Sequence, residues 1–178
     1  MSTLKINLPT ILTLSRIVLI PFFVYTVYLH PLLGVLIFGI ASLTDFLDGY
    51  LARRSGDITK FGIILDPIAD KFLVVSALIV LVDMGRLPAW IAITIIVREF
   101  LVTGLRAVAL SKDIVIPAEI GGKIKTTLQI TAVICLILRN SLFDIDLYDI
   151  GIVLIWAALV LSIISGVRYT VSFGRKIY

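Results

Sequence analysis

The sequence predicts an all-α polytopic membrane protein with six transmembrane helices. Of its 178 residues, 60% are hydrophobic and only 16% are charged, and the mean hydropathy is +1.11. A globular domain is about 45–50% apolar and roughly 25% charged, and a chain this short has too much surface to bury such an excess. The same composition excludes disordered, collagen-like, coiled-coil and disulfide-rich proteins. The chain is therefore expected to lie in a bilayer.

Six apolar windows are long enough to cross that bilayer, because a core about 30 Å thick takes roughly 20 apolar helical residues. The windows are 9–29, 32–54, 62–82, 88–110, 120–138 and 149–172. Short connectors with turn residues separate them, among them His30-Pro31 and Asp83-Met84-Gly85. Only Lys5 precedes the first window and no small-residue cleavage site follows it, which indicates a retained span. With no linker or internal repeat, residues 1–178 are expected to form one membrane domain.

Lysine and arginine are unevenly distributed between the two sides of these windows. The connectors after the first, third and fifth windows contain only Arg86 and Arg139. The opposite side holds Lys5, Arg53, Arg54, Lys60, Lys112, Lys123, Lys125, Arg175 and Lys176. Because the more basic side of a membrane protein faces the cytoplasm, both termini are expected to be cytoplasmic.

The second and third windows contain four aspartates near their shared connector, namely Asp45, Asp48, Asp66 and Asp70. Ionisable residues in a membrane span are costly and are therefore candidates for function. Within each window the two aspartates are three or four residues apart and share a helix face. Asp45 with Asp70, and Asp48 with Asp66, are each centred near Asp57. In an antiparallel hairpin the two pairs should then lie at equal depth and face each other.

Four converging carboxylates require positive charge between them. Only Arg53 and Lys71 lie within a turn on the same faces, too few cations for a purely structural ion-pair network. Oxygen-only ligands are typical of Mg²⁺, Mn²⁺ or Ca²⁺. Two such ions, bridged by the aspartates, would form a two-metal site for a displacement reaction.

The residues between the aspartate pairs fit a phosphate ligand. Gly49 gives a ligand close access to the backbone, and Ala52 is small on the same face. Arg53 offers a planar fork suited to phosphate oxygens. Gly62 and Pro67 interrupt the third window beside the acids, as is tolerated where a helix lines a cavity.

A second set of basic residues predicts a substrate that carries its own phosphate. The set comprises Lys60, Arg98, Arg106, Lys123 and Lys125, with Lys71 beside the aspartates. Arg98 and Arg106 are eight residues apart and fall on roughly one helix face. The set exceeds what a pyrophosphate needs, so we expect an anionic acceptor. The alternative is that these side chains only anchor the helices to anionic headgroups.

The aspartate region reads Asp45-x2-Asp48-Gly49-x2-Ala52-Arg53-x8-Gly62-x3-Asp66-x3-Asp70. At every position this pattern resembles the signature of the CDP-alcohol phosphotransferase family. The resemblance implies a six-helix membrane enzyme, usually a homodimer, that cleaves the pyrophosphate of a CDP-linked donor and releases CMP. It also implies that the four aspartates bind two divalent cations (Mg²⁺ or Mn²⁺) and that Asp70 is the base that activates the acceptor hydroxyl. Donor-binding positions of the family are matched by Gly49, Ala52 and Arg53.

Three further stretches resemble members of this family that use glycerol 3-phosphate. They are Asn7-Leu8-Pro9-Thr10-x2-Thr13-x2-Arg16, Arg98-Glu99-Phe100 with Thr103-Gly104-Leu105-Arg106, and Gly122-Lys123-x-Lys125-Thr126. The similarity covers nearly the full length and implies that CDP-diacylglycerol is the donor and sn-glycerol 3-phosphate the acceptor in phospholipid biosynthesis. It adds Asn7, Thr10 and Arg16 as donor contacts. The implied setting is a bacterial inner membrane, with the active site facing the cytoplasm and no nucleic-acid partner.

Three alternatives stay open at this point. The aspartate spacing does not discriminate between glycerol 3-phosphate and other acceptors of the family, such as serine or inositol phosphate. A membrane prenyltransferase also binds pyrophosphate through aspartates and Mg²⁺, although it would need more spans and well-separated motifs. A divalent-cation carrier would need further acids deep in the other spans.

Overall fold

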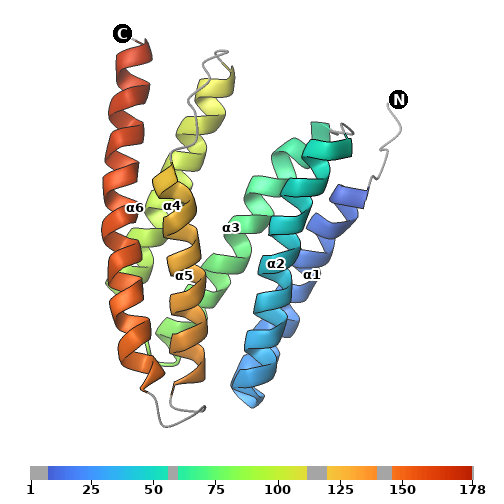
Figure 1. The fold of residues 1–178 in the computed structure, drawn as a ribbon, viewed down its shortest axis with the longest axis vertical. Helices are drawn as coiled ribbons and strands as arrows, with labels where there is room; N and C mark the ends of the chain where they lie inside the picture. Colours follow the sequence, from blue (N-terminus) through green and yellow to red (C-terminus); the bar gives the residue numbers. More distant parts are fainter. Residues whose placement is uncertain (1–7, 56–59, 112–119, 140–145, 178) are drawn as a thin grey trace. The chain divides into compact units, whose positions relative to one another are not determined.

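The computed structural model describes residues 8–55, 60–111, 120–139 and 146–177, and among them the side chains of residues 14–44, 71–109, 124–139 and 146–174. This described part is entirely helical and contains no strand, which confirms the predicted all-α class (Figure 1). Its six helices are α1 (Leu8–Leu29), α2 (Pro31–Ser55), α3 (Lys60–Asp83), α4 (Ala89–Ser111), α5 (Ile120–Leu138) and α6 (Leu147–Ile177).

The helix ends agree with the predicted windows to within two residues, except at the end of α6. The last window stops at residue 172, where the apolar run stops, whereas α6 continues to Ile177. A helix continues past its apolar run without further apolar residues, because its backbone hydrogen bonds are made within the helix. The one-residue connector at His30 is followed by Pro31, whose fixed φ suits the first position of a helix.

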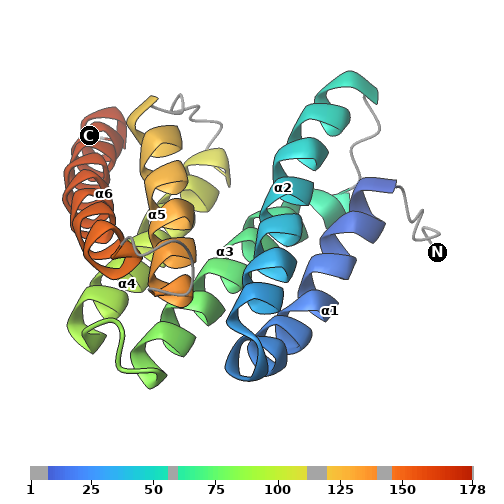
Figure 2. The same cartoon turned by 60° about the horizontal axis from the view of Figure 1, so that its bottom comes forward.

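Contacts within the chain divide it into two compact units, residues 1–80 and 81–178, and each is described by itself. In the first unit α1 and α2 lie side by side as a close hairpin (Figures 1 and 2). Gly34 of α2 lies so close to α1 that a Cβ atom there would be 2.6 Å from the Cα of Val27. One turn further from the connector, the rings of Phe23 and Phe38 are 5.5 Å apart and fully buried.

In the second unit α6 packs against both α5 and α4. A Cβ atom at Gly151 of α6 would lie 2.8 Å from the side chain of Leu136 on α5, so this hairpin is also close. At the other interface, the rings of Trp90 and Trp156 meet edge to face at 5.4 Å. Fully buried apolar side chains between these helices form the core of the unit: Ile91, Ile95, Leu136, Ile137 and Ile155.

The connector after α3 caps the end of that helix and also contacts the last turn of α5. Gly85 has φ 66°, and the amide of Arg86 donates to the carbonyl of Leu81 at 2.9 Å, as in a Schellman motif. The Arg86 guanidinium donates to the carbonyl oxygens of Leu136, at 3.2 Å, and Ile137 in the last turn of α5. Burial, and then the positive charge of Arg139, lower the pKa of Arg86. Arg86 therefore combines hydrogen bonds to α5 with an electrostatic cost.

Large apolar side chains are exposed along the outer surfaces of the helices, which is typical of contact with lipid. Examples are Val18, Phe22, Leu36, Ile40, Ile79, Ile93, Val97, Val153, Val160 and Val167. By length and composition, the stretch Leu147–Gly174 of α6 is able to cross a membrane. The apolar stretches described in α1, α2 and α5 are shorter, namely Leu14–Leu29, Pro31–Thr44 and Ile124–Leu138. The number of spans and the orientation of the termini stay predictions.

Candidate active site

The four aspartates of the predicted metal site lie on two consecutive helices. Asp45 and Asp48 belong to α2, and Asp66 and Asp70 belong to α3. The backbone is helical at all four positions, so each pair keeps the spacing of one helix face. Their side chains fall outside the described residues, and within the described part no group of three or more His, Cys, Asp or Glu gathers. The convergence of the carboxylates therefore stays a prediction.

The register of the α1–α2 hairpin places Arg16 at the level of the first aspartate. Phe23 pairs with Phe38 across the hairpin. Seven residues further from the connector on each helix, the corresponding positions are Arg16 and Asp45. Arg16 is only 1% exposed, although it lies among apolar residues. An arginine that anchors a helix to headgroups keeps its guanidinium in water, so this burial indicates an internal role.

A buried ion cluster joins α4 to α5 in the second unit. The Glu99 carboxylate oxygen Oε1 accepts a hydrogen bond from Nη1 of Arg98 at 3.0 Å and another from Nζ of Lys125. The side chains of Arg98, Glu99 and Lys125 are 14%, 7% and 5% exposed. One carboxylate therefore holds two of the predicted acceptor-binding cations beside each other.

The cluster is also attached to α6 through Arg98. Its Nε donates to the carbonyl oxygen of Ser162 at 2.8 Å, and its Nη2 donates to Oγ of Ser165 at 2.6 Å. Gly166 leaves room for this approach, because a Cβ atom there would lie 3.1 Å from Nε of Arg98. Three helices thus contribute to one set of polar contacts within the second unit.

Arg106 reaches α6 two turns further along α4. Its guanidinium lies over the ring of Tyr169, 5.8 Å from the ring centre, which is a cation–π contact. Since Arg98 and Arg106 both contact α6, they share the helix face that their spacing predicts. Arg98 and Arg106 therefore line the side of α4 that faces α6, and Lys125 of α5 meets Arg98 at Glu99. We call these three residues the positive strip; Arg106 is its exposed end.

Polar atoms without partners accompany this strip. Three buried side-chain atoms in the second unit have no hydrogen-bond partner among the described residues: Nε2 of Gln129, Oγ of Ser162 and the hydroxyl of Tyr169. Gln129 follows Lys125 by one helical turn, and the other two belong to residues that contact Arg98 or Arg106. Buried polar atoms normally have partners, so these atoms represent hydrogen-bonding capacity for a polar ligand.

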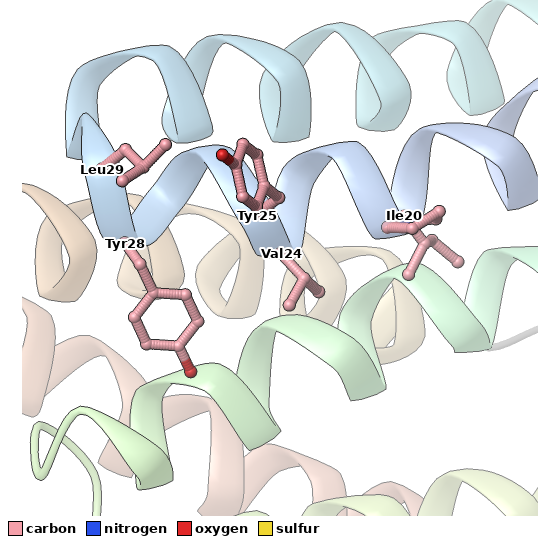
Figure 3. Close-up of a pocket in the computed structure, with 6 residues that line it drawn as sticks. Ile20, Val24, Tyr25, Tyr28 and Leu29 are labelled. Carbon is pink, nitrogen blue, oxygen red and sulfur yellow. The ribbon is translucent and has the colours of Figure 1, made fainter.

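An apolar hollow of about 490 Å³ lies along α1, away from the aspartate end of the hairpin. Figure 3 shows the side chains that line it, which come from successive turns of the helix. The lining residues are Ile20, Pro21, Val24, Tyr25, Tyr28 and Leu29. With no charged group in its lining, the hollow suits hydrocarbon rather than a phosphorylated substrate.

Comparison with known proteins assigns this arrangement to a family. The family model for CDP-alcohol phosphatidyltransferases matches residues 6–164. The chain belongs to the CDP-alcohol phosphatidyltransferase family. It is 43% identical to the CDP-diacylglycerol–glycerol-3-phosphate 3-phosphatidyltransferase of Bacillus subtilis, over 92% of this chain and 93% of that protein.

Two further relatives come from other bacteria. The enzyme of the same name from Rickettsia bellii is 40% identical over 92% of this chain and 93% of its own length. A protein named probable phosphatidylglycerophosphate synthase from Mycobacterium tuberculosis is 41% identical over 96% of this chain and 83% of its own length. The resemblance first seen in the aspartate motif is therefore confirmed over nearly the whole chain.

The structure describes some of the residues expected to form a CDP-alcohol phosphatidyltransferase site and not others. Arg98 and Lys125 come together through Glu99, Arg106 lies further along the same strip, and Arg16 is buried in the first unit. The remaining candidates have side chains outside the described residues: Asn7, Thr10, Asp45, Asp48, Gly49, Ala52, Arg53, Lys60, Asp66, Asp70 and Lys123. Their roles stay predictions.

Sequence reasoning missed the polar residues that hold the cations. Glu99 stands in the sequence prediction only as part of the stretch Arg98-Glu99-Phe100, and Ser165 and Tyr169 of the last window are not part of it. One signal was available, because Glu99 is an acid within an apolar window and must find a cation there. The partner helix could not be named, since that requires the rotation of α4 relative to α5 and α6.

Proposed function

We propose that this family member transfers the phosphatidyl group of CDP-diacylglycerol to sn-glycerol 3-phosphate, giving phosphatidylglycerophosphate and CMP. The observation that carries the proposal is the identity of about 40% to relatives with this printed activity over most of both chains. The complete aspartate signature at residues 45–70 supports it, because that signature contains the residues expected to carry the chemistry.

In this proposal the chain is one membrane domain with six spans, both termini in the cytoplasm, in a bacterial inner membrane. The distribution of lysine and arginine supports this orientation, and the apolar outer surface of the helices supports the location in a membrane. The aspartate end of α2 and α3 then faces the cytoplasm, where CMP and glycerol 3-phosphate are soluble. The diacylglycerol chains stay in the bilayer, and the enzyme acts as a homodimer.

Two divalent cations, Mg²⁺ or Mn²⁺, fit the donor set that the sequence offers. Asp45, Asp48, Asp66 and Asp70 supply only carboxylate oxygens, the ligand type that these hard cations prefer. When bound, the cations supply positive charge that stabilises the pyrophosphate and the departing CMP.

The protein's own groups position the substrates and move one proton. Gly49 and Ala52 allow the donor to approach α2, and Arg53 binds its phosphate oxygens. Thr10 and Arg16 of α1, and Asn7 just before it in the sequence, are the further donor contacts. The carboxylate of Asp70 accepts the proton of the acceptor hydroxyl. The acceptor oxygen then bonds to the lipid phosphorus, and the bond from phosphorus to the CMP oxygen breaks. Positioning and electrostatics account for most of the acceleration in such transfers.

The acceptor's own phosphate binds to the positive strip of the second unit. Arg98, Arg106 and Lys125 belong to this strip. Lys60 and Lys123 are the other residues that the sequence predicts for this role. Arg98 and Lys125, held by the buried carboxylate of Glu99, with unpartnered polar atoms nearby, support a ligand that carries charge and hydroxyl groups.

The test is reconstitution of the purified protein with labelled CDP-diacylglycerol and glycerol 3-phosphate. We expect phosphatidylglycerophosphate and CMP in equal amounts. A lipid product only with serine or inositol phosphate would assign another acceptor. Release of pyrophosphate from an isoprenyl substrate would indicate a prenyltransferase, and metal flux into vesicles without lipid substrate would indicate a carrier.

A further inference from the structure

Glu99 occupies an unusual place, between two cations that come from different helices. Glu99 is only 5% exposed, and its oxygen Oε1 accepts hydrogen bonds from both Arg98 and Lys125. Arg98 precedes it on α4, whereas Lys125 belongs to α5. The three formal charges sum to +1, so the carboxylate keeps two cations together without cancelling both.

The guanidinium of Arg98 is held from a second direction by α6. Its contacts to the carbonyl of Ser162 and to Oγ of Ser165 fix Nε and Nη2, while Glu99 fixes Nη1. These three hydrogen bonds use three of the five N–H groups of a guanidinium. The orientation of Arg98 is therefore determined by two helices before any ligand binds.

We propose that Glu99 is a positioning residue, which holds Arg98 and Lys125 side by side so that both cations meet the phosphate of the acceptor. This inference rests on the proposed function of the enzyme. A carboxylate repels a phosphate, so Glu99 acts through the two cations and not by touching the substrate. A lysine side chain loses rotamer freedom when it binds a ligand, which costs free energy. The ion pair with Glu99 already restricts the rotamers of Lys125 in the free enzyme, so less of this cost remains when the acceptor binds.

Kinetics of the Glu99→Gln variant test this role, because glutamine keeps the size of the side chain and removes its charge. We expect the KM for glycerol 3-phosphate to rise by about tenfold or more, while the KM for CDP-diacylglycerol changes by no more than about twofold. The matched control is Asp149→Asn, the same chemical change at an exposed residue in the first turn of α6. It should leave both KM values unchanged. Equal KM values for wild type and Glu99→Gln, or an equal rise for both substrates, would overturn the proposal.

A charge-swapped variant separates positioning from a structural role. Glu99→Lys combined with Lys125→Glu keeps an ion pair between α4 and α5 but moves the lysine to the other helix. We expect the thermal midpoint of this double variant to be closer to that of wild type than the midpoint of Glu99→Gln is. Its KM for glycerol 3-phosphate should stay about tenfold above the wild-type value. Recovery of this KM together with the stability would show that the pair only joins the helices, and would overturn the proposal even if Glu99→Gln does not fold.

Thermal unfolding with and without glycerol 3-phosphate adds a readout that needs no turnover. Saturating glycerol 3-phosphate should raise the thermal midpoint of wild type and of Asp149→Asn, and should raise that of the charge-swapped variant much less. An equal rise in all three proteins would contradict the positioning role. If wild type makes no phosphatidylglycerophosphate at all, the proposed function fails. If wild type is active and the variants bind the acceptor normally, only the role of Glu99 fails.

Discussion

The α1–α2 hairpin and the α4–α5–α6 unit are held together in different ways. The hairpin depends on close apolar contact, with Phe23 against Phe38 and Gly34 against the backbone of Val27. The other unit adds charges between its helices, centred on Glu99 and Arg98. In a bilayer, apolar helices associate mainly through close packing of small residues, whereas buried charges are costly. Close packing is sufficient to join two helices, so the charges in the second unit support the proposed binding of a charged substrate.

Removal of divalent cations should have the largest effect on activity, and it tests the aspartates of the first unit. Chelation should abolish transfer, and added Mg²⁺ or Mn²⁺ should restore it, because four uncompensated carboxylates cannot hold a pyrophosphate. The helix content, measured by circular dichroism, should stay unchanged. Full activity in a chelator would contradict the metal role of Asp45, Asp48, Asp66 and Asp70.

Loss of the proposed base gives the next largest effect. Asp70→Asn should lower kcat by about three orders of magnitude or more, because the amide neither accepts the hydroxyl proton nor ligates a cation well. The fold should persist, since asparagine has the same size. Turnover of Asp70→Asn within about tenfold of wild type would remove this residue from the role of base.

A methyl group at Gly34 tests the packed hairpin. Gly34→Ala should lower the free energy of unfolding by about 1–3 kcal/mol, because its Cβ would meet backbone atoms of Val27 that cannot move aside. Gly39→Ala is the matched control on the same helix, since a Cβ atom there has nothing within 4 Å. Thermal unfolding in detergent measures both variants. Equal stability of the two would show that close approach does not hold this hairpin.

Arg86 is expected to affect stability without affecting either KM. Arg86→Met removes the hydrogen bonds to the last turn of α5 and should cost about 1–2 kcal/mol, since relief of the buried charge offsets part of the loss. Arg139→Met is the control: this exposed residue lies over the ring of Tyr148 at 5.4 Å and its charge opposes that of Arg86, so its removal should not lower the stability. A raised KM for glycerol 3-phosphate in Arg86→Met would place this residue in the acceptor site and would contradict a purely structural role.

The helices were predicted well because each consists of a long apolar run with a turn residue near its end. Gly85 illustrates this, since a glycine after the third run adopts the positive φ that ends α3. Contacts between helices were harder to predict, because they depend on helix rotation and register. The approach of Gly34 to Val27 and the pairing of Lys125 with Glu99 have no local signal in the chain. Among the site residues, Arg98 and Lys125 were found from their charge, whereas the serine that holds Arg98 was not.

The most direct test of the account compares glycerol 3-phosphate with glycerol as acceptors for the purified enzyme. The two differ by the phosphate that the strip of Arg98, Arg106 and Lys125 is proposed to bind. We expect kcat/KM for glycerol 3-phosphate to exceed that for glycerol by about two orders of magnitude or more, and this preference to fall in Glu99→Gln. Equal use of glycerol and glycerol 3-phosphate would contradict the account, because the positive strip would then have no substrate phosphate to bind.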